Sequence, residues 1–145
     1  MSEIKIEEAT LEEREHINEG LNQYALDALG EIVEYPRISI NRVIKINETV
    51  IAGIIAERDR WNILKIELLW VHEAYRNSGY AGALMKEVED YARDLGCKLS
   101  QLTTLEYQAK GFYEKCGYEV FGILEKCVQG QDRYYMSKRL DDVVE

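Results

Sequence analysis

The sequence predicts a mixed α/β fold: a mostly antiparallel central sheet with a parallel crossover pair and flanking helices. Runs of β-branched residues joined by short turns are interleaved with segments of helical periodicity. One succession of strand, long helix and strand forms a crossover unit, whose two strands run parallel in a sheet otherwise built from hairpins. The 145 residues contain one proline and no low-complexity run, so we expect a single domain over residues 1–145.

The N-terminal segment predicts a strand followed by helix. Ser2–Glu8 alternates isoleucines with charged residues, which is typical of a short half-buried strand. Thr10 stands three residues before Glu13, a capping-box pattern that marks a helix start. Apolar residues then recur at helical intervals up to Gly30, and they fit one helix or two equally well.

Three strands are predicted next, arranged as an antiparallel meander. β-Branched residues dominate Ile38–Lys45 and Thr49–Ala56, and Asn47-Glu48 between them offers a tight hairpin turn. A third apolar run covers Ile63–Val71. Neighbouring antiparallel strands joined by short turns would place these three runs side by side.

After Val71 the hydrophobic period changes from strand to helix. Ala83, Leu84 and Val88 begin one apolar face of a helix that stops at Gly96, a residue suited to a helix C-terminus. The remaining elements follow in order: a strand Cys97–Thr103, a short helix Ala109–Lys115, a strand Gly117–Leu124, a turn Gln129–Asp132 and a last strand Arg133–Arg139.

Composition excludes several function classes. A formal net charge of −9 argues against general affinity for nucleic acid, which needs clustered Lys and Arg. No secretory pattern and no run of eighteen apolar residues occur, so we expect a cytoplasmic protein with no membrane partner. Cys97, Cys116 and Cys127 form no close pair and no histidine lies near them at zinc-ligand spacing, which predicts reduced, buried thiols and no metal site.

The stretch RNSGYAGAL, Arg76–Leu84, places very little side-chain bulk at the start of the long helix. Small residues let a ligand approach the backbone, and the first N–H groups of a helix lack internal acceptors. Together with the helix dipole and Arg76 they predict an anion cradle suited to phosphate. Two alternatives stay open: Gly79 and Gly82 serve only a tight turn and close packing, or the loop binds a nucleotide, although the Gly-Lys-Ser/Thr ending and G-x-G-x-x-G are absent.

The segment LLWVHEAYRNSGYAGALM resembles the acyl-coenzyme A motif of the GCN5-related N-acetyltransferases (GNAT family). Arg76, Gly79 and Ala81 match its pattern of Arg or Gln, two residues, Gly, one residue, then Gly or Ala, and Val71 matches the strand valine. The later segment AKGFYEKCGYEVFG resembles the family's helix and strand that follow. The resemblance is strong from about residue 63 to residue 140, and the first half is compatible with it.

The resemblance implies the acyl-CoA N-acyltransferase fold and acetyl-coenzyme A as co-substrate. In the family, the strand before the motif splays from its parallel neighbour, and its exposed backbone pairs with the pantetheine arm, while the cradle holds the pyrophosphate. The cofactor-binding positions implied in this chain are Leu69, Trp70, Val71, Arg76, Asn77, Ser78, Gly79, Tyr80, Ala81 and Gly82.

The resemblance also implies roles for two side chains. Tyr113 matches the tyrosine that donates a proton to the departing coenzyme A sulfur, although a tyrosine there could equally be a core residue. Glu67, inside an apolar run, is the candidate general base if burial raises its pKa, with an exposed, solvated position as the alternative. Many relatives have Asn seven residues before the tyrosine where this chain has Glu106, which leaves any contact made there in doubt.

The expected function is acetyl transfer from acetyl-coenzyme A to a primary amine of a small molecule or peptide, by direct attack in a ternary complex. The alternative is a non-catalytic acyl-coenzyme A sensor or interaction module of the same fold. Relatives often associate through their C-terminal strands, so a homodimer is one expected assembly, although no sequence feature decides it. The identity of the acceptor is not readable from the sequence.

Overall fold

The chain divides into two compact units, Met1–Val33 and Glu34–Glu145, and the computed structural model describes residues 2–141 of it. The first unit is built on one helix, α1 (Leu11–Leu29). The predicted capping box is confirmed, because Thr10 Oγ1 accepts from the Glu13 N–H at 3.1 Å and Glu13 Oε1 accepts from the Thr10 N–H at 2.9 Å. The helix ends at Gly30, where φ is 81°.

The strand predicted over Ser2–Glu8 is wrong: residues 2–10 adopt no regular secondary structure. Alternation of isoleucine with charged residues fits a strand, but a strand also needs a neighbour to accept and donate its backbone hydrogen bonds. The described part of the first unit contains no second strand that could serve, so the local pattern is not realised.

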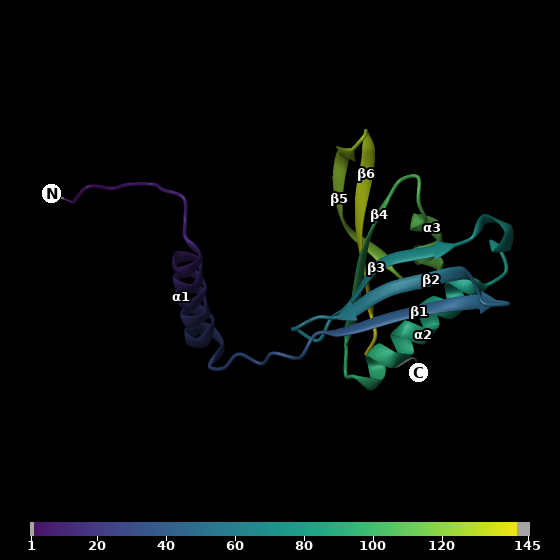
Figure 1. Cartoon of the computed structure of the whole chain (residues 1–145), viewed down its shortest axis with the longest axis horizontal. Helices are drawn as coiled ribbons and strands as arrows, with labels where there is room; N and C mark the ends of the chain where they lie inside the picture. Colours follow the sequence, from purple (N-terminus) through teal and green to yellow (C-terminus); the bar gives the residue numbers. More distant parts are fainter. Residues whose placement is uncertain (1, 142–145) are drawn as a thin grey trace. The chain divides into compact units, whose positions relative to one another are not determined.

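The second unit contains a six-stranded sheet with the strand order β1-β2-β3-β4-β6-β5. All neighbours run antiparallel except β3 and β4, which run parallel, as Figure 1 shows, so the predicted fold class is confirmed. The strands are β1 (Ile38–Ile46), β2 (Thr49–Arg58), β3 (Leu64–Val71), β4 (Leu99–Leu105), β5 (Glu119–Val128) and β6 (Gln131–Arg139).

The β1–β2 hairpin turns where the sequence predicts. Asn47 and Glu48 have φ of 51° and 69°, the left-handed pair that a two-residue type I′ turn requires. Its right-handed twist matches that of the strands on either side, and the turn pairs Ile46 with Thr49. A β-bulge between Ile44 and Lys45 then shifts the register by one residue, which places Ile40 of β1 opposite Ala56 of β2. Both residues are buried, which makes this register the one that fills the core.

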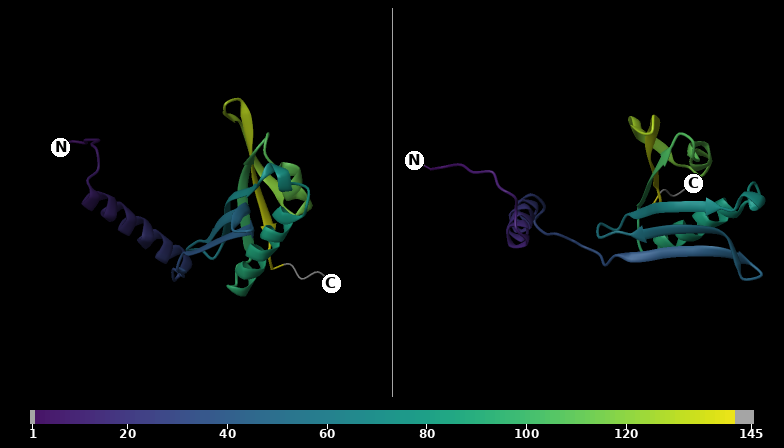
Figure 2. Two further views of the ribbon diagram at one scale, coloured as in Figure 1. Left: turned by 45° about the vertical axis from the view of Figure 1, so that its right-hand side comes forward. Right: turned by 45° about the horizontal axis from the view of Figure 1, so that its top comes forward.

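Helix α2 (Tyr80–Asp94) covers one face of the sheet, and Figure 2 shows it running along β1, β2 and β3. Its apolar face contributes Met85 and Val88, which pack against Ile54 and Leu64 in the core. Each of these side chains is at most 2% exposed, and full burial of an aliphatic side chain stabilises a fold by about 1.5–3 kcal/mol. α2 is therefore rigidly seated, and its N-terminus is held at a fixed place beside β3.

The remaining elements connect β3 to α2 and β4 to β5. A short 3₁₀ turn, η1 (Glu73–Tyr75), leads from β3 toward α2, and a six-residue helix, α3 (Lys110–Lys115), follows β4. The β5–β6 hairpin turns at Gln129 and Gly130, both with positive φ, inside the predicted turn. Within residues 2–141, none of the helices combines the length and apolar character needed to cross a membrane.

The three cysteines are free, but only Cys97 is buried; Cys116 is half-buried and Cys127 is exposed. The prediction of buried thiols is therefore right for Cys97 and wrong for Cys127. Cys127 lies on β5, whose outer side has no strand neighbour in the described sheet. Cys97 lies at the base of β4, where its Sγ donates to Asn62 Oδ1 at 3.3 Å, and burial raises the pKa of its thiol.

Candidate functional site

The parallel strands β3 and β4 separate soon after they meet. They pair only at Leu64 with Ser100 and at Lys65 with Gln101, and beyond these residues the two strands diverge (Figure 1). A cleft of about 920 Å³ opens between them. The splay that the resemblance implies is thus confirmed, and on the β4 side the rest of β3 has no strand partner in the described sheet.

Each wall of the cleft comes from a different part of the chain. The β3 wall and the loop after it supply Glu67, Leu68, Leu69, Trp70, Val71, Tyr75, Arg76, Asn77 and Gly79; α2 supplies Tyr80, Ala81 and Gly82; and β4 with α3 supplies Thr103, Thr104, Tyr107, Gln108, Ala109, Phe112 and Tyr113.

Glu67 lies at a β-bulge on β3. Ile55 of β2 is opposite Leu68 and the next residue, Ala56, is opposite Ile66, so Glu67 has no partner across the pair. A bulge re-aims the side chains that follow it, and bulges are common beside binding sites. Here the core-facing residues of β3 change from even to odd numbers. They are Leu64 and Ile66 before the bulge, and Leu69 and Val71 after it.

The structure corrects the expectation that Glu67 is buried. The side chain lines the cleft but is exposed, in agreement with the alternative interpretation of a solvated position. The surrounding apolar sequence suggested burial because period-two alternation gives no sign of where a bulge falls. An exposed carboxylate in the cleft can still accept a proton, directly or through water.

The loop before α2 presents its backbone to the cleft. Asn77 and Gly79 have φ of 61° and 84°, and α2 begins at Tyr80 with no side-chain cap at its N-terminus. Among residues 2–141, no acceptor takes a hydrogen bond from the backbone N–H groups of residues 77–82. Six consecutive amides at the positive end of a helix dipole form a site suited to an anion.

Gly79 and Gly82 bear on whether this segment serves only a tight turn and close packing or forms an anion cradle. Gly79 needs its left-handed φ for the turn, as the alternative interpretation held. Gly82 has ordinary helical geometry, and a Cβ built on it would meet no atom within 4 Å. Close packing of helix on sheet therefore does not require glycine at position 82, and the space beside its backbone is open.

Arg76 supplies a fixed positive charge at the same end of the cleft. Its Nε donates to the Val71 carbonyl at 3.1 Å, which ties the guanidinium to the last residue of β3. Ser78 is the one predicted cofactor-binding residue that does not line the cleft, and its hydroxyl donates to the Arg76 carbonyl at 3.4 Å. Apart from Arg76, Glu67 is the only charged residue among the lining residues, so the cleft is positive at the loop and negative at the bulge.

Tyr113 lies on the opposite wall, on the inner side of α3. It is 8% exposed, and its ring packs edge-on against Phe112 and Tyr118 at centroid distances of 5.4 Å and 6.1 Å. Within the described part of the chain its hydroxyl has no hydrogen-bond partner. Burial, with a smaller contribution from Cys116, raises the pKa of Tyr113 to about 12, so the phenol keeps its proton at neutral pH.

Glu106, which the sequence left in doubt, and His72, which follows β3, both have structural roles. Glu106 points away from the cleft: its Oε1 accepts from the Asp132 N–H at 2.6 Å, and its own N–H donates to the Asp132 carbonyl at 3.1 Å. Glu106 therefore anchors the β5–β6 hairpin to the end of β4. His72 does not line the cleft, and its Nδ1 accepts from the Ala74 N–H at 3.0 Å to cap η1.

Sequence reasoning missed the polar β4 wall. Thr103, Thr104 and Gln108 line the cleft, and Gln108 Oε1 accepts from the Leu105 N–H at 2.7 Å, which holds the loop after β4 in place. No local signal marks these residues, because their position depends on β4 pairing with a strand about 35 residues earlier. In the part of the chain that the structure describes, no group of three or more His, Cys, Asp or Glu residues could hold a metal ion.

Comparison with known proteins agrees with this geometry. The model of the acetyltransferase (GNAT) family matches residues 6–118. A blasticidin-S acetyltransferase of Streptomyces morookaense is 32% identical over 91 residues, which cover 62% of this chain and 67% of that protein. The crystal structure of an acetyltransferase from Bacillus cereus has a TM-score of 0.77 and 32% sequence identity, covering 94% of this chain and 97% of its own.

The fold also matches an acetyltransferase of Bacillus anthracis solved in complex with acetyl-coenzyme A. The TM-score is 0.65 at 22% identity, with 77% of this chain and 70% of that chain covered. At that identity the likeness shows the shared fold alone. The family match, which spans more than three quarters of the sequence, carries the assignment: this chain belongs to the acetyltransferase (GNAT) family.

Proposed function

We propose that this protein transfers an acetyl group from acetyl-coenzyme A to a primary amine of a small molecule or peptide, by direct attack within a ternary complex. The observation that carries the proposal is the splayed β3–β4 cleft, which has a loop of unpaired amides at one end and a buried tyrosine on its wall. A single domain over residues 1–145 is part of the same proposal.

The loop end of the cleft fits the pyrophosphate of coenzyme A. Amides of residues 77–82 would donate to its oxygens, and the Arg76 guanidinium would add a fixed charge. Over Leu69, Trp70 and Val71, the edge of β3 that faces away from β2 has no strand partner in the described sheet and would bind the amide-bearing pantetheine arm, as a neighbouring strand would. The thioester would then lie farther along β3, toward Glu67.

The reaction forms a bond between the amine nitrogen and the thioester carbon and breaks the carbon–sulfur bond. The nitrogen loses a proton and the departing sulfur gains one. Tyr113 is the proposed donor to sulfur, because this residue lines the cleft and its hydroxyl keeps its proton and has no competing partner among the described residues. A thiolate is normally less basic than a phenolate of pKa about 12. A sulfur bound in the same cleft would also be desolvated, which would raise its pKa toward that of the phenol.

Glu67 is the proposed acceptor of the proton from nitrogen. It lies four residues before Val71 on the same strand, roughly 13 Å away at the usual strand rise. Its negative charge also attracts an ammonium group to this end of the cleft. A relative named for blasticidin-S supports a small-molecule acceptor for this chain.

The test is isothermal titration with acetyl-coenzyme A, followed in the same preparation by thiol release across a panel of amines. We expect saturable binding and accelerated thiol release with at least one primary amine. Binding without release for any amine would favour the non-catalytic sensor. No binding at millimolar coenzyme would remove the basis for both.

A further inference from the structure

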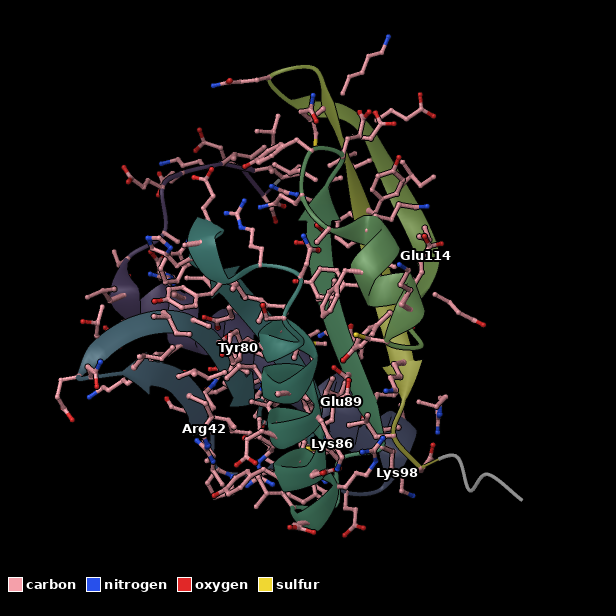
Figure 3. All side chains as sticks on the ribbon, turned by 90° about the vertical axis from the view of Figure 1, so that its right-hand side faces the viewer. Arg42, Tyr80, Lys86, Glu89, Lys98 and Glu114 are labelled. Atoms are coloured by element: carbon pink, nitrogen blue, oxygen red, sulfur yellow. The ribbon has the colours of Figure 1, made fainter. Side chains whose placement is uncertain are left out.

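A buried acidic residue lies behind the catalytic wall, outside the cleft. Glu89 of α2 is 4% exposed and lies on the side of the helix that faces α3 and β6 (Figure 3). Its Oε1 accepts from Lys138 Nζ at 2.7 Å, and its Oε2 accepts from the Tyr118 hydroxyl at 2.8 Å. A buried carboxylate is tolerated only when it is paired in this way, so the three side chains act as one unit.

Tyr118 extends this unit to the central sheet. Its hydroxyl also lies 2.7 Å from Ser100 Oγ on β4. A phenol has one proton, and here it goes to Glu89, so the Ser100 hydroxyl must donate to the Tyr118 oxygen. The resulting chain from Ser100 through Tyr118 and Glu89 to Lys138 joins β4, the loop between α3 and β5, α2 and β6. We call these four residues the Glu89 network.

Tyr113 depends on Tyr118 for its position. The Tyr118 N–H donates to the Tyr113 carbonyl at 3.0 Å, and the two rings are in contact. α3 has six residues, too few for its own hydrogen bonds to hold it, and the Tyr113 hydroxyl has no partner among the described residues. The position of Tyr118 therefore contributes to the direction of the Tyr113 ring.

The helix that carries Glu89 also carries part of the cradle. Gly82 lies seven residues before Glu89 on α2, two helical turns away on the same face and about 10 Å along the axis. α2 thus presents amides to the cleft at one end and holds Tyr118 through Glu89 farther along. One rigid helix therefore connects the proposed anion site with the residues that hold Tyr118.

We propose that Glu89, acting through Tyr118 and supported by Ser100 and Lys138, positions the Tyr113 hydroxyl for proton donation. None of the four residues lines the cleft, so they are positioning residues and not catalytic ones. The inference rests on the proposed function, because it assigns a role relative to Tyr113 as donor. A purely structural role would instead stabilise the fold without a specific effect on Tyr113.

The test is a double-mutant cycle on kcat with Tyr118→Phe, made in the parent and in the Tyr113→Phe background. Loss of the Tyr118 oxygen leaves the phenol of Tyr113 less well aimed, and we expect kcat in the parent to fall about tenfold, since small misplacements of catalytic groups have effects of this order or larger. The Kd for acetyl-coenzyme A should stay within about twofold, because the cradle is untouched. In the Tyr113→Phe background the same change should have no further effect on kcat.

An equal loss of kcat in both backgrounds would overturn the inference, because a general structural defect does not require Tyr113. If Tyr118→Phe does not fold, the cycle is repeated with Ser100→Ala. This milder change removes only the hydroxyl that donates to Tyr118. Tyr91→Phe is the matched control: it removes a phenol oxygen from α2, the helix that carries Glu89, at a residue 38% exposed, and we expect parental kcat.

A second readout separates this inference from the proposed function. If the parent protein binds acetyl-coenzyme A but acetylates no amine, the proposed function fails. Placement of Tyr113 is then followed by NMR of protein labelled with ¹³C-tyrosine, with its signal assigned by loss in Tyr113→Phe. A shift of that signal in Ser100→Ala supports positioning by the network, and an unchanged signal overturns it.

Discussion

The anion cradle predicts opposite outcomes for one substitution made at two glycines. Gly79 at the start of α2 and Gly130 in the β5–β6 turn have φ of 84° and 79°, and a Cβ built on either meets no atom within 4 Å. Changing either to Glu places a side chain in the left-handed region, at roughly 1–2 kcal/mol. Gly79→Glu and Gly130→Glu should therefore lower stability equally, by about 2–4 °C in melting temperature per kcal/mol.

Only the change at Gly79 should weaken coenzyme binding. A carboxylate about 5 Å from one phosphate charge repels it by about 0.8 kcal/mol at the dielectric of water and about 3 kcal/mol at an effective dielectric of about 20. The pyrophosphate carries two such charges, and the added side chain also occupies space that is open in the parent. Since about 1.4 kcal/mol is tenfold in affinity, we expect the Kd for acetyl-coenzyme A to rise at least about tenfold.

Isothermal titration of both variants, after circular dichroism has shown each to be folded, measures the difference. Gly79→Ala separates bulk from charge and should give a smaller loss that does not depend on salt. The loss in Gly79→Glu should shrink as ionic strength rises, because salt screens the repulsion. Parental Kd values in a folded Gly79→Glu protein would refute the placement of the pyrophosphate on residues 77–82.

Three further predictions follow from the two walls of the cleft. Tyr113→Phe should lower kcat by about 10²-fold or more at an almost unchanged Kd for acetyl-coenzyme A, as expected for loss of a general acid; a parental kcat would exclude Tyr113 as donor. Because burial raises the pKa of Tyr113 to about 12, its protonated form persists well above neutral pH and is lost only as the pH approaches that value. We therefore expect no alkaline fall in kcat up to about pH 10. A fall near pH 9 that is absent in Tyr113→Phe would contradict the raised pKa. Glu106→Ala should destabilise the fold by about 1–2 kcal/mol, since the Asp132 N–H loses its acceptor, while kcat stays at the parental value. Thermal melts measure the loss of stability, and thiol release measures kcat. A large loss of kcat would show that Glu106 takes part in the reaction.

Features set by neighbouring residues were predictable from the sequence. The capping box of Thr10 and Glu13, the hairpin turn at Asn47 and Glu48 and the uncapped start of α2 all follow from contacts within a few residues. The same holds for the cradle, because its donors are consecutive amides of one loop. The strand expected over Ser2–Glu8 shows the limit of such patterns, since a strand also needs a partner that its own sequence cannot supply.

The site beyond the cradle required the tertiary structure. The bulge that exposes Glu67 arises from the register of β3 against β2, which no alternation pattern reveals. The polar β4 wall meets the β3 wall only because two strands from distant parts of the chain pair at Leu64 and Ser100 and then diverge.

The sequence by itself therefore determined the order of most elements, the family resemblance and the loop that we propose as the anion site, which depend on local backbone geometry and side-chain period. Only the tertiary structure decided that Glu67 is exposed, that Glu106 serves the β5–β6 hairpin, and that Glu89 meets Lys138 from 49 residues away. The physical reason is that burial and pairing of charged groups depend on which distant segments pack together, and a carboxylate has the same appearance in the sequence whether it is solvated, anchors a turn or lies in the core.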